Sequence, residues 1–208
     1  MKINRKAFFD NYRNKYGKLT QSKVKALDFL IGKLETGRFK LETQMGYILA
    51  TIMHETNGTF EPVVEGYWLG ANRKNKLYNY YLQKNPKALK SIFPNGVNGL
   101  TYEGRGFVQL THEYNYEPFG LKDKPDEAME PDTAFKVMEK GLANGQFGHK
   151  LQSHINETKT DYINARRCVN GTDKAKLIAG YAEQFTKWIE LVDDSLAMVA
   201  YNQESYLS

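Results

Sequence analysis

The feature that most constrains the fold is the spacing of apolar residues in the N-terminal part of the chain. After Thr20, a residue type that caps helix N-termini, apolar residues recur three and four positions apart, and Gly37 follows close to the expected end of a helix. These apolar residues are Val24, Leu27, Leu30, Ile31 and Leu34. Because a helix brings such positions onto one face, whereas a half-buried strand needs alternation, the pattern predicts a helix of roughly three or four turns.

A second helical pattern places a carboxyl group at an unusual position. Its apolar residues are Leu41, Met45, Ile48, Leu49 and Ile52, and it meets Asn57-Gly58, a pair suited to a left-handed helix end. Glu55 falls in the last turn, on the same stripe. Partial burial and the negative end of a helix both raise the pKa of a carboxyl group, so we expect Glu55 to be partly protonated near neutral pH and able to donate a proton. The alternative is a solvated side chain at a fraying helix end.

The rest of the chain also favours helices. Over 61–104, aromatic and basic residues alternate between several glycines and prolines, which suggests short helices separated by loops. The run 107–111 alternates apolar and polar residues and predicts a small strand. Helical patterns return at 134–142 and 162–169, and a last long helix is expected after a cap at Thr172, with an apolar face made of Leu177, Tyr181, Ala182, Phe185, Trp188, Ile189 and Val192. We therefore predict a mainly α-helical fold with one small β element in the middle.

The composition indicates one folded domain. The chain has 208 residues, of which 41% are hydrophobic and 25% charged, and it contains no internal repeat and no linker rich in proline, glycine or serine. The first ten residues reach Asp10 too soon for the apolar part of an export signal, and the longest apolar run, 45–53, is about half of what a membrane helix needs. We expect neither an export signal nor membrane insertion. Cys168 is the only cysteine, which excludes an intramolecular disulfide and favours folding in a reducing compartment.

The net charge of +5 favours a polyanionic partner without identifying it. Nucleic acid, an anionic lipid surface and an acidic cell-wall polymer all fit. The basic residues read as scattered among acids, and the sequence contains no evident recognition helix, so we expect no nucleic-acid partner.

Two acids near Glu55 are candidates for a second catalytic carboxylate. Cleavage of a glycosidic bond by direct displacement needs an acid and, roughly 6.5 to 9.5 Å away, a carboxylate that activates water. Glu61 and Glu65 follow Glu55 in the chain, and Glu65 precedes Gly66-Tyr67-Trp68, whose aromatic rings can stack on sugar faces. The alternative for both acids is an ordinary place on the surface.

Polar side chains near the predicted strand form a second candidate group. Gln109 and Thr111 are two positions apart, so in a strand they share a face, and Asn115 follows closely. A hydroxyl group with an amide neighbour can hold and orient an attacking water, although these residue types also serve as ordinary turn and edge residues. His54 and His112 have no second histidine at metal-ligand spacing, so we expect no catalytic metal and no other cofactor.

Three stretches taken together resemble a known family. They are ILATIMHETNGT at 48–59, YEGRGFVQLTHEYNY at 102–116 and ARRCVNG at 165–171. In this order they resemble the acid-bearing helix, the Gly-Arg-Gly block with Gln-Leu-Thr, and the later arginine-containing helix of glycoside hydrolase family 19. This is the chitinase-like group of the lysozyme-like superfamily, which includes phage and prophage endolysins. The resemblance implies a lysozyme-like α-helical domain with a small β element beside an active-site cleft.

The resemblance also assigns roles to residues. Glu55 would be the general acid, and Thr111 would hold the attacking water. The implied substrate-binding set is Tyr102, Arg105, Gln109, Asn115 and Asn170, in which Tyr102 and Arg105 support the cleft. Arg166 or Arg167 would contact these site residues and hold them in position without touching the substrate.

No motif of this chain matches the family's general base. The shorter phage-type members place an acid about where Glu65 stands, so Glu65 is our prediction, with Glu61 in reserve. Glu103 stands where the family has an aromatic residue, and it is a further candidate for the base or for a substrate contact. The family is typically inverting, which implies one step without a covalent intermediate.

Chitin and peptidoglycan share a repeat of β-1,4-linked N-acetylated sugars, so one site would serve either. The lack of an export signal, of disulfides and of a chitin-binding appendage favours an endolysin over a secreted chitinase. We expect a monomeric, muramidase-type peptidoglycan hydrolase, made in the bacterial host cytoplasm and acting on the cell wall after release. Residues 1–208 would form one catalytic domain without a separate wall-binding domain. The alternatives are a chitinase of the same family and a non-catalytic glycan-binding module.

Overall fold

The computed structural model describes residues 2–193, which form a mainly α-helical structure. Contacts among the described residues divide them into two compact units, the first comprising 2–60 with 139–193 and the second comprising 61–138. The second unit therefore interrupts the first in sequence, and helix α7 (Pro131–Asn144) begins in the second and ends in the first. That both units work as one catalytic domain stays a prediction.

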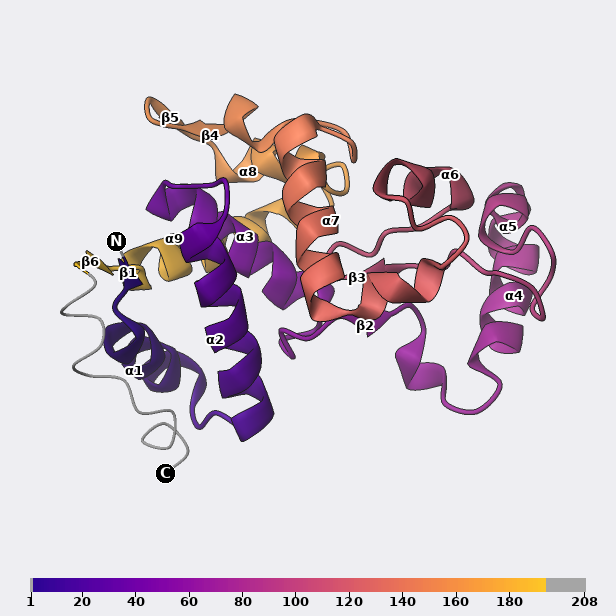
Figure 1. Cartoon of the computed structure of the whole chain (residues 1–208), viewed down its shortest axis with the longest axis horizontal. Helices are drawn as coiled ribbons and strands as arrows, with labels where there is room; N and C mark the ends of the chain where they lie inside the picture. The colour runs from indigo at the N-terminus through magenta and orange to yellow at the C-terminus, as the bar shows by residue number, and fades with distance from the viewer. Residues whose placement is uncertain (1, 194–208) are drawn as a thin grey trace. The chain divides into compact units, whose positions relative to one another are not determined.

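The first unit is built from helices and two small antiparallel β-pairs. Its elements are β1 (Lys2–Ile3), α1 (Arg5–Tyr16), α2 (Gln21–Thr36), α3 (Glu42–Glu55), η4 (Leu151–Ser153), β4 (Ile155–Asn156), β5 (Lys159–Thr160), α8 (Tyr162–Ala165), η5 (Arg166–Cys168), α9 (Ala175–Trp188) and β6 (Leu191–Val192), with the end of α7 (Figure 1). Strand β1 pairs with β6, and β4 pairs with β5 in a hairpin. The sequence predicts neither pair.

The core of the first unit lies between α3 and α9. Helix α3 is buried without a break over 44–52. A Cβ atom built on Gly46 would lie only 2.8 Å from the backbone nitrogen of Thr186 in α9. Because glycine has no side chain, the two helices approach each other closely at this point. The same helix ends at Glu55.

Both N-terminal helix predictions are confirmed. Helix α2 follows Thr20, whose side chain accepts a backbone hydrogen bond of 3.3 Å, and Gly37 directly follows the last helical residue. All five apolar residues of its predicted stripe are buried. After α3 the chain enters the left-handed region at Asn57 (φ 51°) and Gly58 (φ 73°), as the residue types predict.

The last long helix differs from its prediction at both ends. It begins at Ala175, after Lys174 in a left-handed conformation (φ 55°), so the predicted cap at Thr172 is wrong. Leu177 is 45% exposed, and Val192 lies in strand β6 instead of the helix. The inward stripe of the helix consists of Ala175, Ile178, Ala179, Ala182 and Phe185, so the prediction is confirmed for Ala182 and Phe185. Three of these buried residues are alanines. The predicted face is drawn mainly through larger apolar residues, so it leaves out Ala175 and Ala179.

Helix α1 is an element that the sequence pattern does not predict. Its N-cap, Asn4, accepts a hydrogen bond from the backbone of Ala7 at 3.1 Å. The helix buries three aromatic residues, Phe8, Phe9 and Tyr12, in the first unit. Aromatic residues are weak helix formers, which is why the segment lacks a clear signal.

The second unit consists of short helices and one small sheet. Its elements are β2 (Val63–Val64), η1 (Tyr67–Leu69), α4 (Arg73–Lys84), α5 (Pro86–Ile92), β3 (Arg105–Gly106), α6 (Glu113–Tyr116), η2 (Glu117–Phe119), η3 (Pro125–Met129) and the first part of α7. Helices α4 and α5 lie side by side (Figure 1) and share a small apolar core of Leu77, Ile92 and Phe93. Short helices separated by loops are what the sequence predicts over 61–104.

The small strand lies two residues earlier than predicted. Strand β3 pairs antiparallel with β2, with Gly106 opposite Val63. The run 107–111 is a turn, in which Leu110 returns to bond Arg105 through N–H···O distances of 2.9 and 3.1 Å. Gly106 (φ 82°) and Gln109 (φ 52°) both adopt left-handed backbone conformations, which reverse the chain. The strand prediction for 107–111 is therefore wrong, since alternation over so few residues also fits a tight turn.

Candidate functional site

The predicted site residues fall into two groups, one in each unit. The second unit contains Glu65, Tyr102, Arg105, Gln109, Thr111 and Asn115, and the first contains Glu55 and Asn170. The contacts within each group are described separately below, first for the second unit and then for the first.

In the second unit, Glu65 is held from two sides. Its backbone N–H donates to the carbonyl of Gly104 at 2.7 Å, and the N–H of Gly104 donates to Glu65 Oε2 at 3.0 Å. The hydroxyl of Tyr81, on α4, donates to Glu65 Oε1 at 2.7 Å. Burial, and next the negative charge of Glu65, raise the pKa of Tyr81, so the phenol stays a hydrogen-bond donor. These contacts fix the direction of the carboxylate.

Gly104 is the residue around which this group is assembled. While its N–H binds Glu65, a Cβ atom built on it would lie 2.8 Å from Gln109 Oε1 and 3.2 Å from Thr111 Oγ1. A carboxylate, a carboxamide and a hydroxyl thus surround one glycine. A side chain at this position would push against Gln109 and Thr111.

The hydroxyl and amide groups are positioned by the turn after β3. The side chain of Gln109 donates to the carbonyl of Val63 at 3.0 Å, which ties the turn to strand β2. Thr111 Oγ1 donates to the carbonyl of Gln109 at 2.7 Å, so its lone pairs are free to accept a hydrogen bond from water. Asn115 donates to the carbonyl of Thr111 at 2.8 Å. Gln109 and Thr111 are brought together by this turn and not by a strand.

Tyr102 and Arg105 are buried supports of the same loop. The side chain of Arg105 is 2% exposed, and its guanidinium donates to the carbonyl of Thr101 at 2.9 Å and pairs with Asp126 at 2.9 Å. Tyr102 is 3% exposed, and its hydroxyl donates to the carbonyl of Lys122 at 2.9 Å. Both side chains therefore stabilise the loop from inside.

Glu103 forms a buried ion-pair cluster. Its side chain is 0% exposed and lies 2.7 Å from Arg73 and 3.4 Å from Arg105. Burial by itself would raise the pKa of Glu103, but the charge of Arg105 and hydrogen bonds from Thr101 and Arg73 outweigh burial and lower it. The ionised carboxylate holds the loop together and has no access to solvent, whereas Glu61, the other alternative base, is exposed.

In the first unit, Glu55 at the end of α3 forms an ion pair with Arg166. Glu55 Oε1 lies 2.5 Å from Arg166 Nη1, and the two side chains are 13% and 1% exposed. Arg166 Nε also donates to the carbonyl of Asp173 at 3.0 Å, so the guanidinium is held on its other side. Glu55 is therefore an anchored, largely buried carboxyl group and not a solvated one.

Asn170 and Arg167 are exposed neighbours of this pair in sequence. The backbone N–H of Asn170 donates to the carbonyl of Arg166 at 3.0 Å, and the Asn170 side chain is exposed. Arg167 is exposed as well, and its guanidinium donates a long hydrogen bond of 3.4 Å to Asn164 Oδ1. Of the two arginines that the resemblance leaves open, Arg166 is the one that contacts Glu55.

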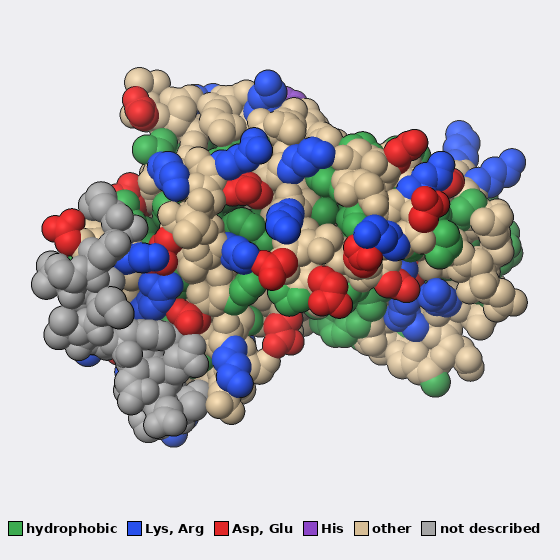
Figure 2. Space-filling view, viewed as in Figure 1, with side chains coloured by type: hydrophobic (Ala, Val, Ile, Leu, Met, Phe, Trp, Pro, Cys, Tyr) green, Lys and Arg blue, Asp and Glu red, His purple; other side chains and the backbone are tan. Residues whose placement is uncertain are grey.

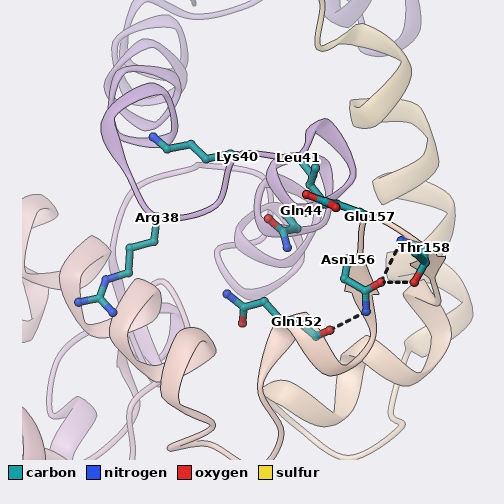
Figure 3. A pocket seen from close by; sticks show the side chains of 8 residues that line it. All are labelled: Arg38, Lys40, Leu41, Gln44, Gln152, Asn156, Glu157 and Thr158. Carbon is teal, nitrogen blue, oxygen red and sulfur yellow. Dashed lines mark hydrogen bonds between the residues drawn. The ribbon is translucent and has the colours of Figure 1, made fainter.

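Two pockets of the first unit lie beside α3. One, of about 170 Å³, is lined by Met53, His54, Asn57, Gly58 and Tyr181, so it adjoins the turn that carries Glu55. The other, of about 490 Å³, lies at the start of α3 and is lined by Arg38, Lys40, Leu41, Gln44, Gln152, Asn156, Glu157 and Thr158 (Figure 3). In this polar pocket the carboxamide of Asn156 is already used in bonds to Gln152 and Thr158. The predicted site residues are absent from both linings.

The remaining predicted features are an aromatic platform and two histidines. Tyr67 and Trp68, which follow Glu65, are 43% and 70% exposed and pack edge to face. His112 Nδ1 lies 2.9 Å from Ser91 Oγ, and burial lowers the pKa of His112 against the opposing charge of Glu65. Within residues 2–193, no three His, Cys, Asp or Glu side chains are grouped to hold a metal ion.

Sequence reasoning missed two residues that position Glu65. Tyr81 lies 16 residues further along the chain and Arg73 lies eight further, where its guanidinium donates to the Glu65 carbonyl at 2.8 Å. Neither belongs to the motifs that resemble a family. The sequence predicts short helices over 61–104, but no signal in it distinguishes these two residues.

The chain was also compared with known proteins. No protein-family model, no curated protein and no solved structure matches it. In the part of the chain that the structure describes, no helix has both the length and the apolar character needed to cross a membrane.

Proposed function

We propose that this chain is a glycoside hydrolase that cleaves peptidoglycan, an endolysin of the muramidase type with a lysozyme-like fold. The observation that carries the proposal is the group around Gly104, where the carboxylate of Glu65 is held beside the side chains of Gln109 and Thr111. The sequence resemblance to family 19 glycoside hydrolases singles out Gln109, Thr111 and the Gly-Arg-Gly block, which build this group.

Glu55 is the proton donor in this proposal. Its carboxyl group is held by Arg166 at the end of α3, and its side chain remains 13% exposed. Arg166 is a positioning residue here, since it acts through Glu55.

Glu65 is the general base. Among the three alternatives it is the carboxylate that lies beside Thr111, whereas Glu103 is fully buried between two guanidinium groups. The hydroxyl oxygen of Thr111 accepts a hydrogen bond from the attacking water. Glu65 takes a proton from that water as it attacks the anomeric carbon. The family resemblance implies that Glu55 protonates the departing oxygen in the same step and that the anomeric configuration is inverted.

The substrate class follows from the resemblance and from exposed groups. Trp68 and Tyr67 offer aromatic surfaces for sugar faces, and exposed Asn170 offers an amide for N-acetylated sugars, to which the resemblance adds half-buried Asn115. Peptidoglycan is our choice, with synthesis in the bacterial host cytoplasm and action on the wall after release. Chitin of the same linkage is the alternative substrate.

The test is turnover of purified peptidoglycan and of chitin oligomers by the parent chain and by Glu55→Gln, Glu65→Gln and Glu61→Gln. Glu61→Gln is the matched control, because it removes a nearby exposed carboxylate. We expect release of sugar fragments from peptidoglycan to fall by about a hundredfold or more in the first two variants and to stay at the parent level in the control. Turnover of chitin alone would identify a chitinase. Tight glycan binding without turnover by the parent chain would identify a binding module and overturn the proposal.

A further inference from the structure

Two of the four histidines of the chain form a pair in the first unit. His149 Nδ1 lies 3.0 Å from His154 Nε2, which is hydrogen-bond distance. The ring centroids are 5.2 Å apart, only 2.2 Å more than the two nitrogens, and the ring planes differ by 22°. Because this difference is close to the sum of the two ring radii, both nitrogens lie near the line between the centroids. The rings therefore meet nitrogen to nitrogen, nearly in one plane.

Such a contact accommodates one added proton but not two. A neutral imidazole has one N–H donor and one acceptor nitrogen, so at neutral pH one ring of the pair donates to the other. When one ring is a cation, the neutral ring still accepts its N–H. When both rings are cations, both facing nitrogens carry a hydrogen, and two N–H groups point at each other across 3.0 Å. The doubly protonated pair must therefore separate.

His154 is an unfavourable place for a positive charge. It is 8% exposed, whereas His149 is exposed. Within residues 2–193 its second ring nitrogen, Nδ1, is buried and has no hydrogen-bond partner, so a cation would leave a buried N–H unsatisfied. Burial, and next the neighbouring His149, lower the pKa of His154.

The charged groups around His154 are mostly basic. Lys159 on β5 and Arg167 on η5 oppose a positive charge on the ring, and Asp161 favours one. Asp161 is engaged elsewhere, since it pairs with Lys159 at 3.6 Å and accepts a hydrogen bond from the backbone of Asn164 at 3.0 Å. Figure 2 shows that the small histidine surface visible on one face of the molecule lies beside Lys or Arg side chains. The surroundings therefore act in the same direction as burial.

The pair closes the segment 145–154, which connects α7 to strand β4. Within the segment, a Cβ atom built on Gly148 would lie 2.5 Å from the carbonyl oxygen of Arg167, so its backbone packs closely against η5. Gln152, in the same segment, lines the polar pocket at the start of α3 together with residues 156–158 of the hairpin (Figure 3). The segment that the pair closes is thus part of one wall of this pocket.

We propose that His149 and His154 form a pH-dependent latch, which holds residues 145–154 in place at neutral pH and releases them in acid when both rings are protonated. The pKa of His154 in the folded chain lies below its ordinary value of 6.5, so below pH 6.5 the released segment binds more protons than the closed one. The stability of the closed segment is therefore complete above pH 6.5 and is lost as the pH falls through the lowered pKa.

The test is amide hydrogen exchange of residues 145–154 in the full chain at pH 7.5 and pH 5, corrected for the intrinsic exchange rate at each pH. We expect protection in the parent to fall by about tenfold, the effect of one pKa unit. In His149→Gln it should fall by less than about threefold, because a carboxamide can accept from protonated His154 as well as donate to the neutral ring.

The matched control is His54→Gln, which removes a half-buried histidine of the same unit outside the pair. Its protection should fall as in the parent. Constant protection in the parent, or equal falls in the parent and His149→Gln, would overturn the latch.

A second variant, Lys159→Gln, tests the link between protonation and release. Because it removes a cation that opposes the charge on His154, it should raise the midpoints of the His154 titration, followed by NMR, and of the loss of protection together, by roughly half a pH unit. Lys25→Gln, an exposed lysine of the same unit, should move neither. A shifted His154 titration with an unshifted loss of protection would contradict the proposal. Neither measurement depends on the proposed enzymatic activity.

Discussion

Gly104 is the glycine of the second unit around which the predicted site residues gather. Its φ is not in the left-handed region, so an alanine suits the backbone there, but the added Cβ would lie 2.8 Å from Gln109 Oε1. We predict that Gly104→Ala lowers kcat on purified peptidoglycan by about a hundredfold, because displacements of about an ångström near reacting groups have effects of that size.

The matched control for this substitution is Gly180→Ala. Gly180 lies inside α9, and apart from the neighbouring backbone of that helix no heavy atom lies within 4 Å of a Cβ built on it. Activity should be unchanged, and the free energy of unfolding should rise by up to about 1 kcal/mol, because alanine is the better helix former. Full activity of Gly104→Ala would show that catalysis does not depend on the observed positions of the Gln109 and Thr111 side chains.

Glu103 makes a separate prediction about stability. Replacing it with glutamine leaves Arg105 and Arg73 without their buried counter-charge, so we expect Glu103→Gln to lower the free energy of unfolding at pH 7 by about 3 kcal/mol. Denaturant unfolding measures this, with Glu130→Gln as an exposed control in the same unit. A loss no greater than that of the control would contradict the role of the cluster.

The pH dependence of the same variant has a definite sign. The pKa of Glu103 in the folded chain lies below its ordinary value of 4.5, so its contribution is fully present above 4.5 and is lost as the pH falls through the lowered pKa. The stability of the parent should therefore fall in acid below pH 4.5, and that of Glu103→Gln should fall less steeply. Parallel curves of unfolding free energy against pH would contradict this assignment.

At this scale the sequence predicts residue types better than contacts. It identifies Glu55 as an inward-facing carboxyl group, because helical spacing fixes its side of α3. It does not find Tyr81, since the contact with Glu65 depends on how α4 packs and not on local spacing. It leaves Arg166 and Arg167 undistinguished, because a tight helical turn decides which one faces Glu55.

Among the elements, the contact of α3 with α9 depends on Gly46. A Cβ at this position would lie 2.8 Å from the backbone nitrogen of Thr186 and 3.0 Å from its Cα, and backbone atoms cannot move aside easily. We predict that Gly46→Ala lowers the free energy of unfolding by about 2 kcal/mol, although alanine favours a helix. Thermal unfolding of Gly46→Ala beside Gly180→Ala measures the contrast, and equal stabilities would contradict the packing account.

Element by element, the sequence predicts best where capping and periodicity agree. Thr20 and Gly37 delimit α2, and the pair Asn57-Gly58 follows α3, because these residue types have strong backbone preferences. The turn over 107–111 is not predicted, because it depends on a left-handed Gln109, a conformation that this residue type rarely adopts. Strands of two residues are too short to leave a pattern.

On the scale of the whole molecule, composition and periodicity are sufficient for the mainly α-helical class. They do not reveal that the chain forms two compact units, because α7 crosses the boundary at 138–139 without any break in its helical pattern. The net charge of +5 similarly conceals a segment of charge +6 at 66–102 within an almost neutral chain. Properties averaged over the whole sequence therefore reveal neither the two units nor the charged segment.

The central claim is that the whole chain cuts a glycosidic bond of peptidoglycan. Mass analysis of the fragments released from purified peptidoglycan tests it most directly, since the sugar at the new reducing end shows which bond was cut. The account predicts fragments with intact peptide stems and a muramic acid residue at the new reducing end, and no such fragments with Glu55→Gln. Fragments with cleaved peptide stems and intact glycan strands would contradict it.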